Sequence, residues 1–228
     1  MERAPEEKAL VILSGGQDSA TCLYWALEEF PHVEAITFDY GQRHRVELEC
    51  AAKIALDAQI PHVVIPINSL SALSANALTS AAVEVKADGG FQNLPSTFVP
   101  GRNILFLTLA ASHAAPRGIA NLVIGACETD FSGYPDCRDR FLSAMEVALS
   151  EGLAFPMAIQ RPLMRLTKAN TFRLAAALEC LDVVLEDTHT CYEGVRGERH
   201  AWGYGCGRCP ACELRRKGYE EFRQTRSA

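Results

Sequence analysis

The sequence has no excess of basic residues. Its 22 Lys and Arg stand against 28 Asp and Glu, which gives a formal net charge of −6 at pH 7. A protein that binds a polynucleotide through its phosphates normally carries a surplus of cations. The acidic balance therefore predicts that nucleic acid is not a partner.

Long hydrophobic runs are also missing. The longest mostly apolar stretch, 104–115, is interrupted by Thr108, Ser112 and His113, and it is too short to cross a bilayer. Residues 1–8 are polar and acidic and lack the basic and apolar regions of a secretion signal. We therefore expect a cytoplasmic protein with no membrane partner.

Disulfides are not expected either, although the chain has nine cysteines, because the cytosol keeps thiols reduced. Four cysteines follow the spacing C-x14-C-x2-C-x2-C, namely Cys191, Cys206, Cys209 and Cys212. Four thiolates at this spacing can fill the tetrahedral coordination of one structural Zn2+. An iron–sulfur cluster or free thiols on a mobile tail are the alternatives, with His189 and His200 as substitute ligands. We favour one zinc ion per chain.

The order of predicted elements indicates an α/β fold. Short apolar strands are predicted at 9–13, 34–38, 62–67, 122–126 and 157–160, with helices at 18–29, 45–56, 103–115 and 139–150. Thr167 is the predicted N-cap of a further helix. This alternation predicts a doubly wound, mainly parallel, Rossmann-like sheet. We expect one α/β domain over 1–188, followed by a zinc-binding segment and C-terminal helix over 189–228.

A glycine turn joins the first predicted strand to the first predicted helix. Its sequence, SGGQDS at 14–19, would direct backbone N–H groups and the positive end of the helix dipole at one anion. The lysine of the Walker P-loop is missing. The hexapeptide instead resembles the pyrophosphate-binding loop of the N-type ATP pyrophosphatases, which transfer AMP. A tight turn without a ligand is the alternative.

Two further polar segments are expected near this turn. FVPGRN at 98–103 begins a helix, and Arg102 can bind a carboxylate or phosphate with two hydrogen bonds. ETDFSGYPDCR at 128–138 follows an apolar strand, which brings acids, an aromatic ring and an arginine to the sheet edge where such folds bind ligands. The stretch 69–100 has little periodicity and is interpreted as a long irregular segment near a site or a lid.

Together these segments resemble the 7-cyano-7-deazaguanine synthase family. The resemblance is carried by SGGQDS at 14–19, FDYGQRH at 38–44, TFVPGRN at 97–103, ETDFSGYPDCRDRF at 128–141 and the terminal cysteines. It implies a ligase of queuosine precursor synthesis. In that reaction ATP adenylates the carboxylate of 7-carboxy-7-deazaguanine, ammonia converts it to an amide, and a second adenylation allows AMP to leave and the nitrile to form.

The resemblance also implies roles for individual residues. ATP, with Mg2+ at its phosphates, would bind Leu13, Ser14, Gly15, Gly16, Gln17, Asp18, Ser19, Ala20, Thr21, Cys22 and Leu23, with Asp39 and Gln42 on the nucleoside side. The substrate would contact Arg102, Asp130, Tyr134, Asp136 and Arg138. The catalytic candidates are Asp18, Arg102, Asp130 and Asp136. A homodimer is expected, although no residue pattern marks its interface.

Two other functions stay open on the residues alone. A tRNA-thiolating ATP pyrophosphatase would use cysteines such as Cys127 and Cys137 to carry sulfur, and the acidic charge argues against it. A nucleotide sensor would bind ATP without turnover. The connection 192–205 is longer than the family pattern. It is interpreted as a surface loop, with a lid over the site or a subunit contact as the alternatives.

Overall fold

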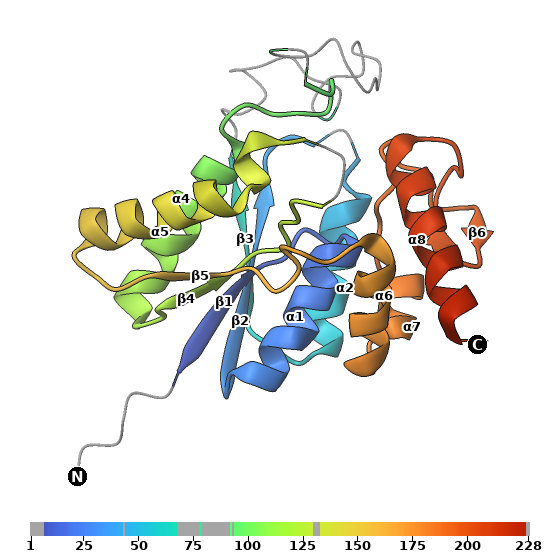
Figure 1. Cartoon of the computed structure of the whole chain (residues 1–228). Coiled ribbons are helices and arrows are strands. Elements are labelled where there is room, and N and C mark those ends of the chain that lie inside the picture. Colours follow the sequence, from blue (N-terminus) through green and yellow to red (C-terminus); the bar gives the residue numbers. More distant parts are fainter. Residues whose placement is uncertain are drawn as a thin grey trace.

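Five parallel strands form one sheet at the centre of the molecule (Figure 1). The computed structural model describes residues 7–42, 44–67, 78, 92, 94–129 and 133–226. The strands are β1 (Lys8–Ile12), β2 (His32–Asp39), β3 (His62–Pro66), β4 (Asn121–Val123) and β5 (Ala158–Gln160), in the order β3-β2-β1-β4-β5. All four pairings are parallel. The strand order reverses between β1 and β4, which is the switch point where such sheets bind ligands, and the predicted doubly wound sheet is confirmed.

Helices cover both faces of the sheet (Figure 1). One face carries α4 (Arg102–Ala114) and α5 (Asp139–Leu153), and the other carries α1 (Gln17–Glu29) and α2 (Val46–Asp57). Beyond α1 lie α6 (Lys168–Ala177), α7 (Leu181–Glu186) and α8 (Pro210–Arg226). Two short 3-10 turns are η2 (Ala115–Arg117) and η3 (Pro135–Cys137).

The central strand β1 shows why the sheet needs helices on both sides. Successive side chains of a strand point to opposite faces. Leu10 and Ile12 belong to the core under α4 and α5, while Ala9 and Val11 belong to the core under α1 and α2. Burying a Val, Leu or Ile side chain contributes roughly 1.5–3 kcal/mol. A strand that is covered on both faces has a continuous apolar sequence. For this reason β1 could be predicted from the sequence alone.

A further hydrophobic core holds the outer helices to the α/β layers. The ring of Phe172 in α6 lies 5.9 Å from that of Phe222 and 5.3 Å from that of Tyr219, both in α8. The side chain of Thr167 accepts a hydrogen bond from the backbone N–H of Asn170, which confirms the predicted N-cap of α6. The C-terminal helix is thus packed against the α/β domain, and the proposed boundary between them stays a prediction.

Two small elements differ from the sequence-based expectation. α7 has six residues, too few to show a helical period. A hairpin of β6 (Arg199–His200) and β7 (Gly203–Tyr204) has strands of two residues each, too short for an alternating pattern. The expected irregular segment 69–100 lies mostly outside the described residues.

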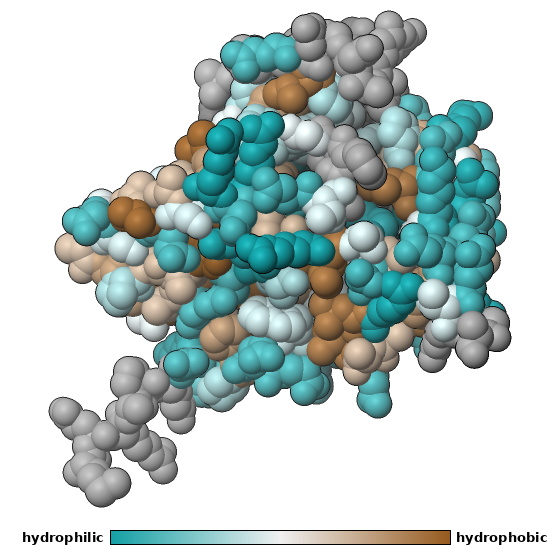
Figure 2. Space-filling view, viewed as in Figure 1, coloured by the Kyte–Doolittle hydropathy of each residue, from teal (hydrophilic) through white to brown (hydrophobic). Residues whose placement is uncertain are grey.

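The surface over α8 is largely hydrophilic, at the right edge of the view in Figure 2. The helix turns its apolar residues, such as Phe222, toward the protein, as expected for an amphipathic surface helix. No helix in the described part of the chain is long and apolar enough to cross a membrane.

Candidate active site and metal centre

The loop between β1 and α1 is a turn closed by its own serine hydroxyls. The hydroxyl oxygens of Ser14 and Ser19 lie 3.0 Å apart, and the Ser14 backbone N–H donates to the Ser19 hydroxyl at 3.1 Å. The Ser19 hydroxyl also donates to the carbonyl of Gly16 at 3.1 Å. Because α1 begins at Gln17, the unpaired N–H groups at its start are available to a bound anion. This local geometry suits a phosphate group.

Gly15 determines how closely α2 approaches this loop. Its φ of +83° lies in the region that favours glycine. A Cβ atom there would lie 2.1 Å from the carbonyl oxygen of Glu47 and 2.9 Å from the backbone nitrogen of Ala51. The loop and the start of α2 therefore touch through their backbones, and a side chain at this position would separate them.

Asp18 forms an ion pair that sequence reasoning missed. Its Oδ2 lies 2.6 Å from Nζ of Lys168, whose side chain is only 10% exposed. Its Oδ1 is buried without a hydrogen-bond partner among the described residues. Lys168 begins α6, and 150 positions separate it from Asp18, so no local pattern could link the two. A cation from a distant helix thus lies beside the loop that lacks the Walker lysine.

A cavity of about 270 Å3 opens beside this loop. It is bordered by residues 13, 14 and 16–19 of the loop, 37, 38 and 40 at the end of β2, 102, 103 and 106 of α4, and 124–126 after β4. The carboxyl ends of β1, β2 and β4 therefore meet at one site, as the switch point predicts. The volume lies near the lower limit for small-molecule sites.

The predicted ATP residues divide into two groups. Leu13, Ser14, Gly16, Gln17, Asp18, Ser19 and Gln42 border the cavity, whereas Ala20, Thr21, Cys22 and Leu23 are fully buried within α1. The Asp39 carboxylate pairs with Arg45 at 2.9 Å and does not border the cavity. Both polar atoms of the buried Gln17 amide lack a partner in the described part of the chain, as expected of a side chain that contacts a ligand. The individual roles stay predictions.

Among the predicted substrate residues, Arg102 borders the cavity and Asp136 supports its wall. The Asp136 carboxylate accepts a hydrogen bond from the backbone N–H of Asn103 at 3.2 Å, and the Asn103 side chain donates to the Asp136 carbonyl at 3.0 Å. The N–H groups at a helix start need such acceptors. Asp136 is therefore committed to the first turn of α4, next to Arg102.

Three other predicted substrate residues lie farther along this segment. The Tyr134 hydroxyl forms a hydrogen bond with the Thr97 hydroxyl, and its ring lies 5.5 Å from that of Phe98. Arg138 is the N-cap residue of α5. Neither Tyr134 nor Arg138 borders the cavity, and Asp130 lies outside the described residues.

Charged and phenolic groups on the cavity wall shift one another's pKa values. Burial raises the pKa of Glu47 to about 7, and the nearby Arg102 charge opposes that rise. Burial likewise raises the pKa of Tyr40 to about 12, again opposed by Arg102. Burial alone would lower the pKa of Arg102, but Tyr40 and Asp136 more than offset it and the pKa is raised. Sequence reasoning missed Glu47, which follows the FDYGQRH segment by three positions.

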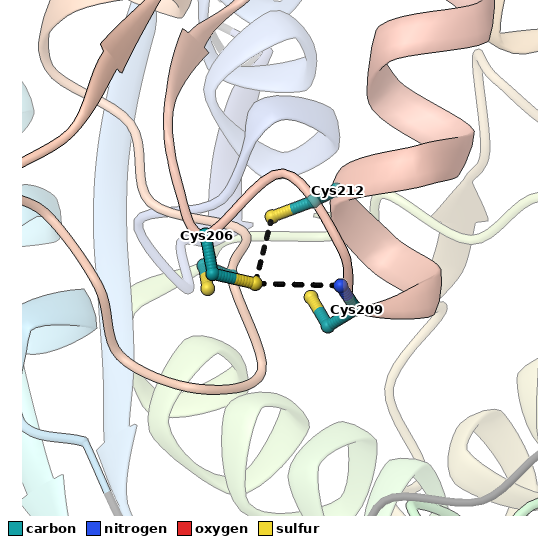
Figure 3. Close-up of side chains that lie close together, drawn as sticks. Cys206, Cys209 and Cys212 are labelled. Atoms are coloured by element: carbon teal, nitrogen blue, oxygen red, sulfur yellow. Dashed lines mark hydrogen bonds between the residues drawn. The ribbon is translucent and has the colours of Figure 1, made fainter.

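The four cysteines of the predicted metal site converge at the turn before α8. The sulfur atoms of Cys191, Cys206, Cys209 and Cys212 all lie within 4.8 Å of one another. Figure 3 shows the last three side chains directed toward one another, with 4.0 Å between the sulfurs of Cys206 and Cys212. A tetrahedral zinc ion with Zn–S bonds of about 2.3 Å needs sulfurs about 3.8 Å apart. The cluster therefore fits a metal ion of this kind.

A fully buried arginine lies one turn beyond Cys212. Arg215 donates hydrogen bonds to the carbonyls of Trp202 at 2.8 Å and Val184 at 2.6 Å, and to the hydroxyls of Thr188 at 2.9 Å and Thr190 at 2.8 Å. Burial lowers its pKa to about 10, so it remains charged at neutral pH. Four thiolates on one divalent ion carry net negative charge, which would favour this cation.

Residues 188–191 connect the cysteine cluster to the loop 14–19. The backbone N–H of His189 donates to the carbonyl of Gly15 at 2.9 Å, and its buried ring bonds the carbonyl of Cys191 at 3.1 Å. The threonines on either side of His189 hold Arg215. One short stretch thus contacts the loop and the buried arginine and ends at the first cysteine of the cluster.

The connection 192–205 is packed against the cysteine cluster. Trp202 is 4% exposed, and its ring stacks on that of His200 with 4.4 Å between centroids. Arg196 donates to the carbonyl of Thr188 at 2.9 Å. Gly205 leaves room for the Cys212 side chain, because a Cβ at position 205 would lie 2.6 Å from the Cys212 sulfur. The interpretation of 192–205 as a surface loop, with a lid or a subunit contact as the alternatives, stays a prediction.

Comparison with known proteins identifies the family. The model of the family described as queuosine biosynthesis protein QueC matches residues 8–223. A 7-cyano-7-deazaguanine synthase of Methylibium petroleiphilum is 55% identical over 228 residues, covering 94% of this chain and 95% of that protein. One from an Acidovorax species is 49% identical over 239 residues, covering 100% and 98%.

Among solved structures, the NH3-dependent NAD synthetase of Campylobacter jejuni overlays with a TM-score of 0.49 at 18% identity, over 80% of this chain and 69% of that one. The family assignment rests on the family model and the full-length relatives, and it confirms the resemblance inferred from the sequence. This chain belongs to the QueC family of queuosine biosynthesis proteins.

Proposed function

We propose that this protein is an ATP-dependent ligase that converts 7-carboxy-7-deazaguanine and ammonia to 7-cyano-7-deazaguanine. Relatives that are about half identical over their whole length carry the name of that synthase. The structural observation that carries the proposal is the shared cavity, which the loop 14–19 and Arg102 both border. A nucleotide phosphate and a substrate carboxylate can therefore meet in one site.

The first half of the reaction forms an amide. A carboxylate oxygen of the substrate attacks the α-phosphorus of ATP, and diphosphate leaves. The lone pair of ammonia then attacks the acyl carbon, AMP leaves with the electrons of the C–O bond, and a proton is released. Water would hydrolyse the acyl adenylate, so the bound substrates must exclude it from the reacting carbon.

The second half removes the amide oxygen. That oxygen attacks the α-phosphorus of a second ATP and diphosphate leaves. Loss of AMP and protons then gives the nitrile. The protein acts by positioning and by neutralising charge. Ser14, Gly16 and Ser19 would hold phosphate, Lys168 and a Mg2+ ion at Asp18 would neutralise it, and Arg102 would hold the carboxylate.

We assign the four-cysteine site to a structural Zn2+. Thiolates are preferred zinc ligands, and four of them leave no coordination position for water or substrate. The ion would stabilise the fold of the C-terminal segment, since binding free energy at such sites adds to folding free energy. It takes no part in the steps above.

Sulfur transfer to RNA is less well supported. Cys137 borders the cavity, but burial and the charge of Asp136 raise its pKa to about 12. A thiol with such a pKa is almost entirely protonated at neutral pH, and the thiolate is the nucleophile. Cys127 hydrogen-bonds to the carbonyl of Leu166 at 3.0 Å, as a structural thiol does.

The test is mass spectrometry of the zinc-loaded protein incubated with ATP, Mg2+, ammonium and 7-carboxy-7-deazaguanine. We expect the nitrile together with AMP. Asp18→Asn should lose nitrile formation by roughly a hundredfold or more, whereas Asp57→Asn, on the exposed end of α2, should not. AMP without nitrile would require another acceptor, and absence of both products from folded protein would refute the proposal.

We further propose that the enzyme works in the cytoplasm as a homodimer. Light scattering at working concentration tests the second point, with a mass of about twice 24.9 kDa expected. A monomer that retains full turnover would contradict it.

A further inference from the structure

The reaction scheme leaves one carboxylate of the cavity without a role. Asp18 and Glu47 both border the cavity. Asp18 is paired with Lys168, whereas the half-buried Glu47 carboxylate forms no hydrogen bond or ion pair with any residue that the structure describes. Burying a carboxylate without donors is costly. A ligand that brings hydrogen-bond donors would therefore be stabilised at this position.

Other acids near the cavity are already engaged. The Asp136 carboxylate accepts from the backbone of Asn103, and the Asp39 carboxylate pairs with Arg45. Glu47 is held differently, because its backbone carbonyl is pressed against Gly15. This contact fixes the position of the first turn of α2 and leaves the Glu47 side chain on the cavity wall.

The wall around Glu47 combines a flat apolar surface with a cation. The rings of Phe38 and Phe106 are stacked with 4.5 Å between centroids, and the ring of Tyr40 lies 5.4 Å from that of Phe106. Arg102 borders the same cavity and is close enough to act on Glu47 electrostatically. The wall thus offers hydrogen-bond acceptors and donors side by side next to aromatic rings.

The proposed substrate has the complementary pattern. A 7-deazaguanine ring keeps the guanine edge, on which an oxygen acceptor at C6 stands beside the N1–H and 2-amino donors. The 7-carboxylate lies on the side of the C6 oxygen. Two adjacent donors match the two oxygens of a carboxylate, and a guanidinium matches the oxygen and the 7-carboxylate.

We propose that the Glu47 carboxylate accepts hydrogen bonds from N1–H and the 2-amino group of the deazaguanine ring, while Arg102 faces the C6 oxygen and the 7-carboxylate. Glu47 is then the specificity-determining residue for a 2-amino-6-oxo ring. This inference rests on the proposed function, because it takes the deazaguanine as the substrate. It also places the reacting carboxylate on the Arg102 side of the cavity.

The experiment compares Glu47→Gln with wild type on the substrate and on its analogue that lacks the 2-amino group. Glu47→Gln keeps the side-chain size but replaces one acceptor with a donor. We expect the KM for the substrate to rise roughly 10- to 100-fold in this variant, as for loss of a hydrogen bond to a charged group. The KM for ATP should stay within about twofold of wild type.

The analogue supplies the second arm of the test. Wild type should lose roughly tenfold in kcat/KM when the 2-amino group is absent, whereas Glu47→Gln should lose less than about twofold, because the partner of that group is already gone. Glu49→Gln is the matched control, with the same change at an exposed position of the same helix. It should behave as wild type on both compounds.

Other outcomes would overturn the inference. An equal loss for the analogue in wild type and Glu47→Gln would show that another group reads the 2-amino donor. A rise in the KM for ATP or for ammonium alone would assign Glu47 to those ligands. Wild type that forms no nitrile would refute the proposed function itself, whereas active wild type with an unchanged Glu47→Gln would refute only the role of Glu47.

Discussion

The loop 14–19 and the cysteine cluster are connected by the stretch 188–191 but are stabilised in different ways. The loop follows a strand in which Leu10 and Val11 are fully buried between two helical layers. The cluster lies in a segment whose own core consists of little more than Trp202, Ala211 and the cysteines themselves. Hydrophobic burial stabilises the first, whereas the second has one buried cation beside it and would gain its stability from the proposed metal ion. The loop 14–19 is thus contacted by a segment of the chain that has little hydrophobic core of its own.

Removing a metal ligand tests this contrast most severely. Cys212→Ser should lose the zinc and lower the free energy of unfolding by about 5 kcal/mol or more, as expected when a structural metal is lost. ATP affinity should fall as well, because residues 188–191 contact the loop. Metal analysis, urea unfolding and ATP calorimetry provide the readouts.

Cys50→Ser is the matched control for this change. Cys50 is also buried but is not part of the cluster, so this variant should retain one equivalent of zinc. A Cys212→Ser protein that still binds a full equivalent of zinc would show that the cluster is not the metal site.

Removing the buried cation separates its contribution from that of the metal. Arg215→Met leaves two carbonyls and two hydroxyls without their donor, which should cost about 3–5 kcal/mol in the free energy of unfolding. Arg216→Met is the control: that side chain is 44% exposed and lies 3.9 Å from Glu220, so the change should cost less than about 0.5 kcal/mol. Equal urea midpoints for the two variants would show that Arg215 contributes no more to stability than the exposed Arg216 does.

A substitution in the loop 14–19 should destabilise the fold through a steric clash with α2. Gly15→Ala places a Cβ atom 2.1 Å from a backbone oxygen of α2, so α2 must move, and we expect a loss of more than about 2 kcal/mol. Gly118→Ala has a similar positive φ of +68° but no atom within 4 Å, and it should cost about 1 kcal/mol. Thermal unfolding compares the two. If Gly15→Ala lost no more stability than Gly118→Ala, the loop and α2 could move apart at little energetic cost.

The sequence predicts those parts whose signal is local. Buried strands are continuous apolar runs, the loop 14–19 is a compact motif, and the cysteine cluster is marked by the spacing of its four residues. Lys168 and Arg215 carry no such signal, because their partners lie far away in the sequence or are backbone carbonyls.

Asp136 is a residue whose sequence signal does not reveal its contacts in the structure. Its place in a polar segment predicts contact with substrate, but a helix that begins at Arg102 leaves backbone N–H groups to be satisfied, and Asp136 accepts one of them from Asn103. Glu47 was overlooked because a glutamate in the first turn of a helix is ordinary in sequence. Its significance comes from the cavity that other elements build around it.

The hydrogen bond from His189 to Gly15 has a consequence for the order in which the protein is completed. During synthesis, chains fold from the N-terminus, so β1 and the loop after it emerge from the ribosome long before their C-terminal partner. The 188–191 stretch is in turn fixed by Arg215 near the end of the chain. We therefore expect the loop 14–19 to reach its final arrangement only after Arg215 has left the ribosome and fixed the stretch 188–191.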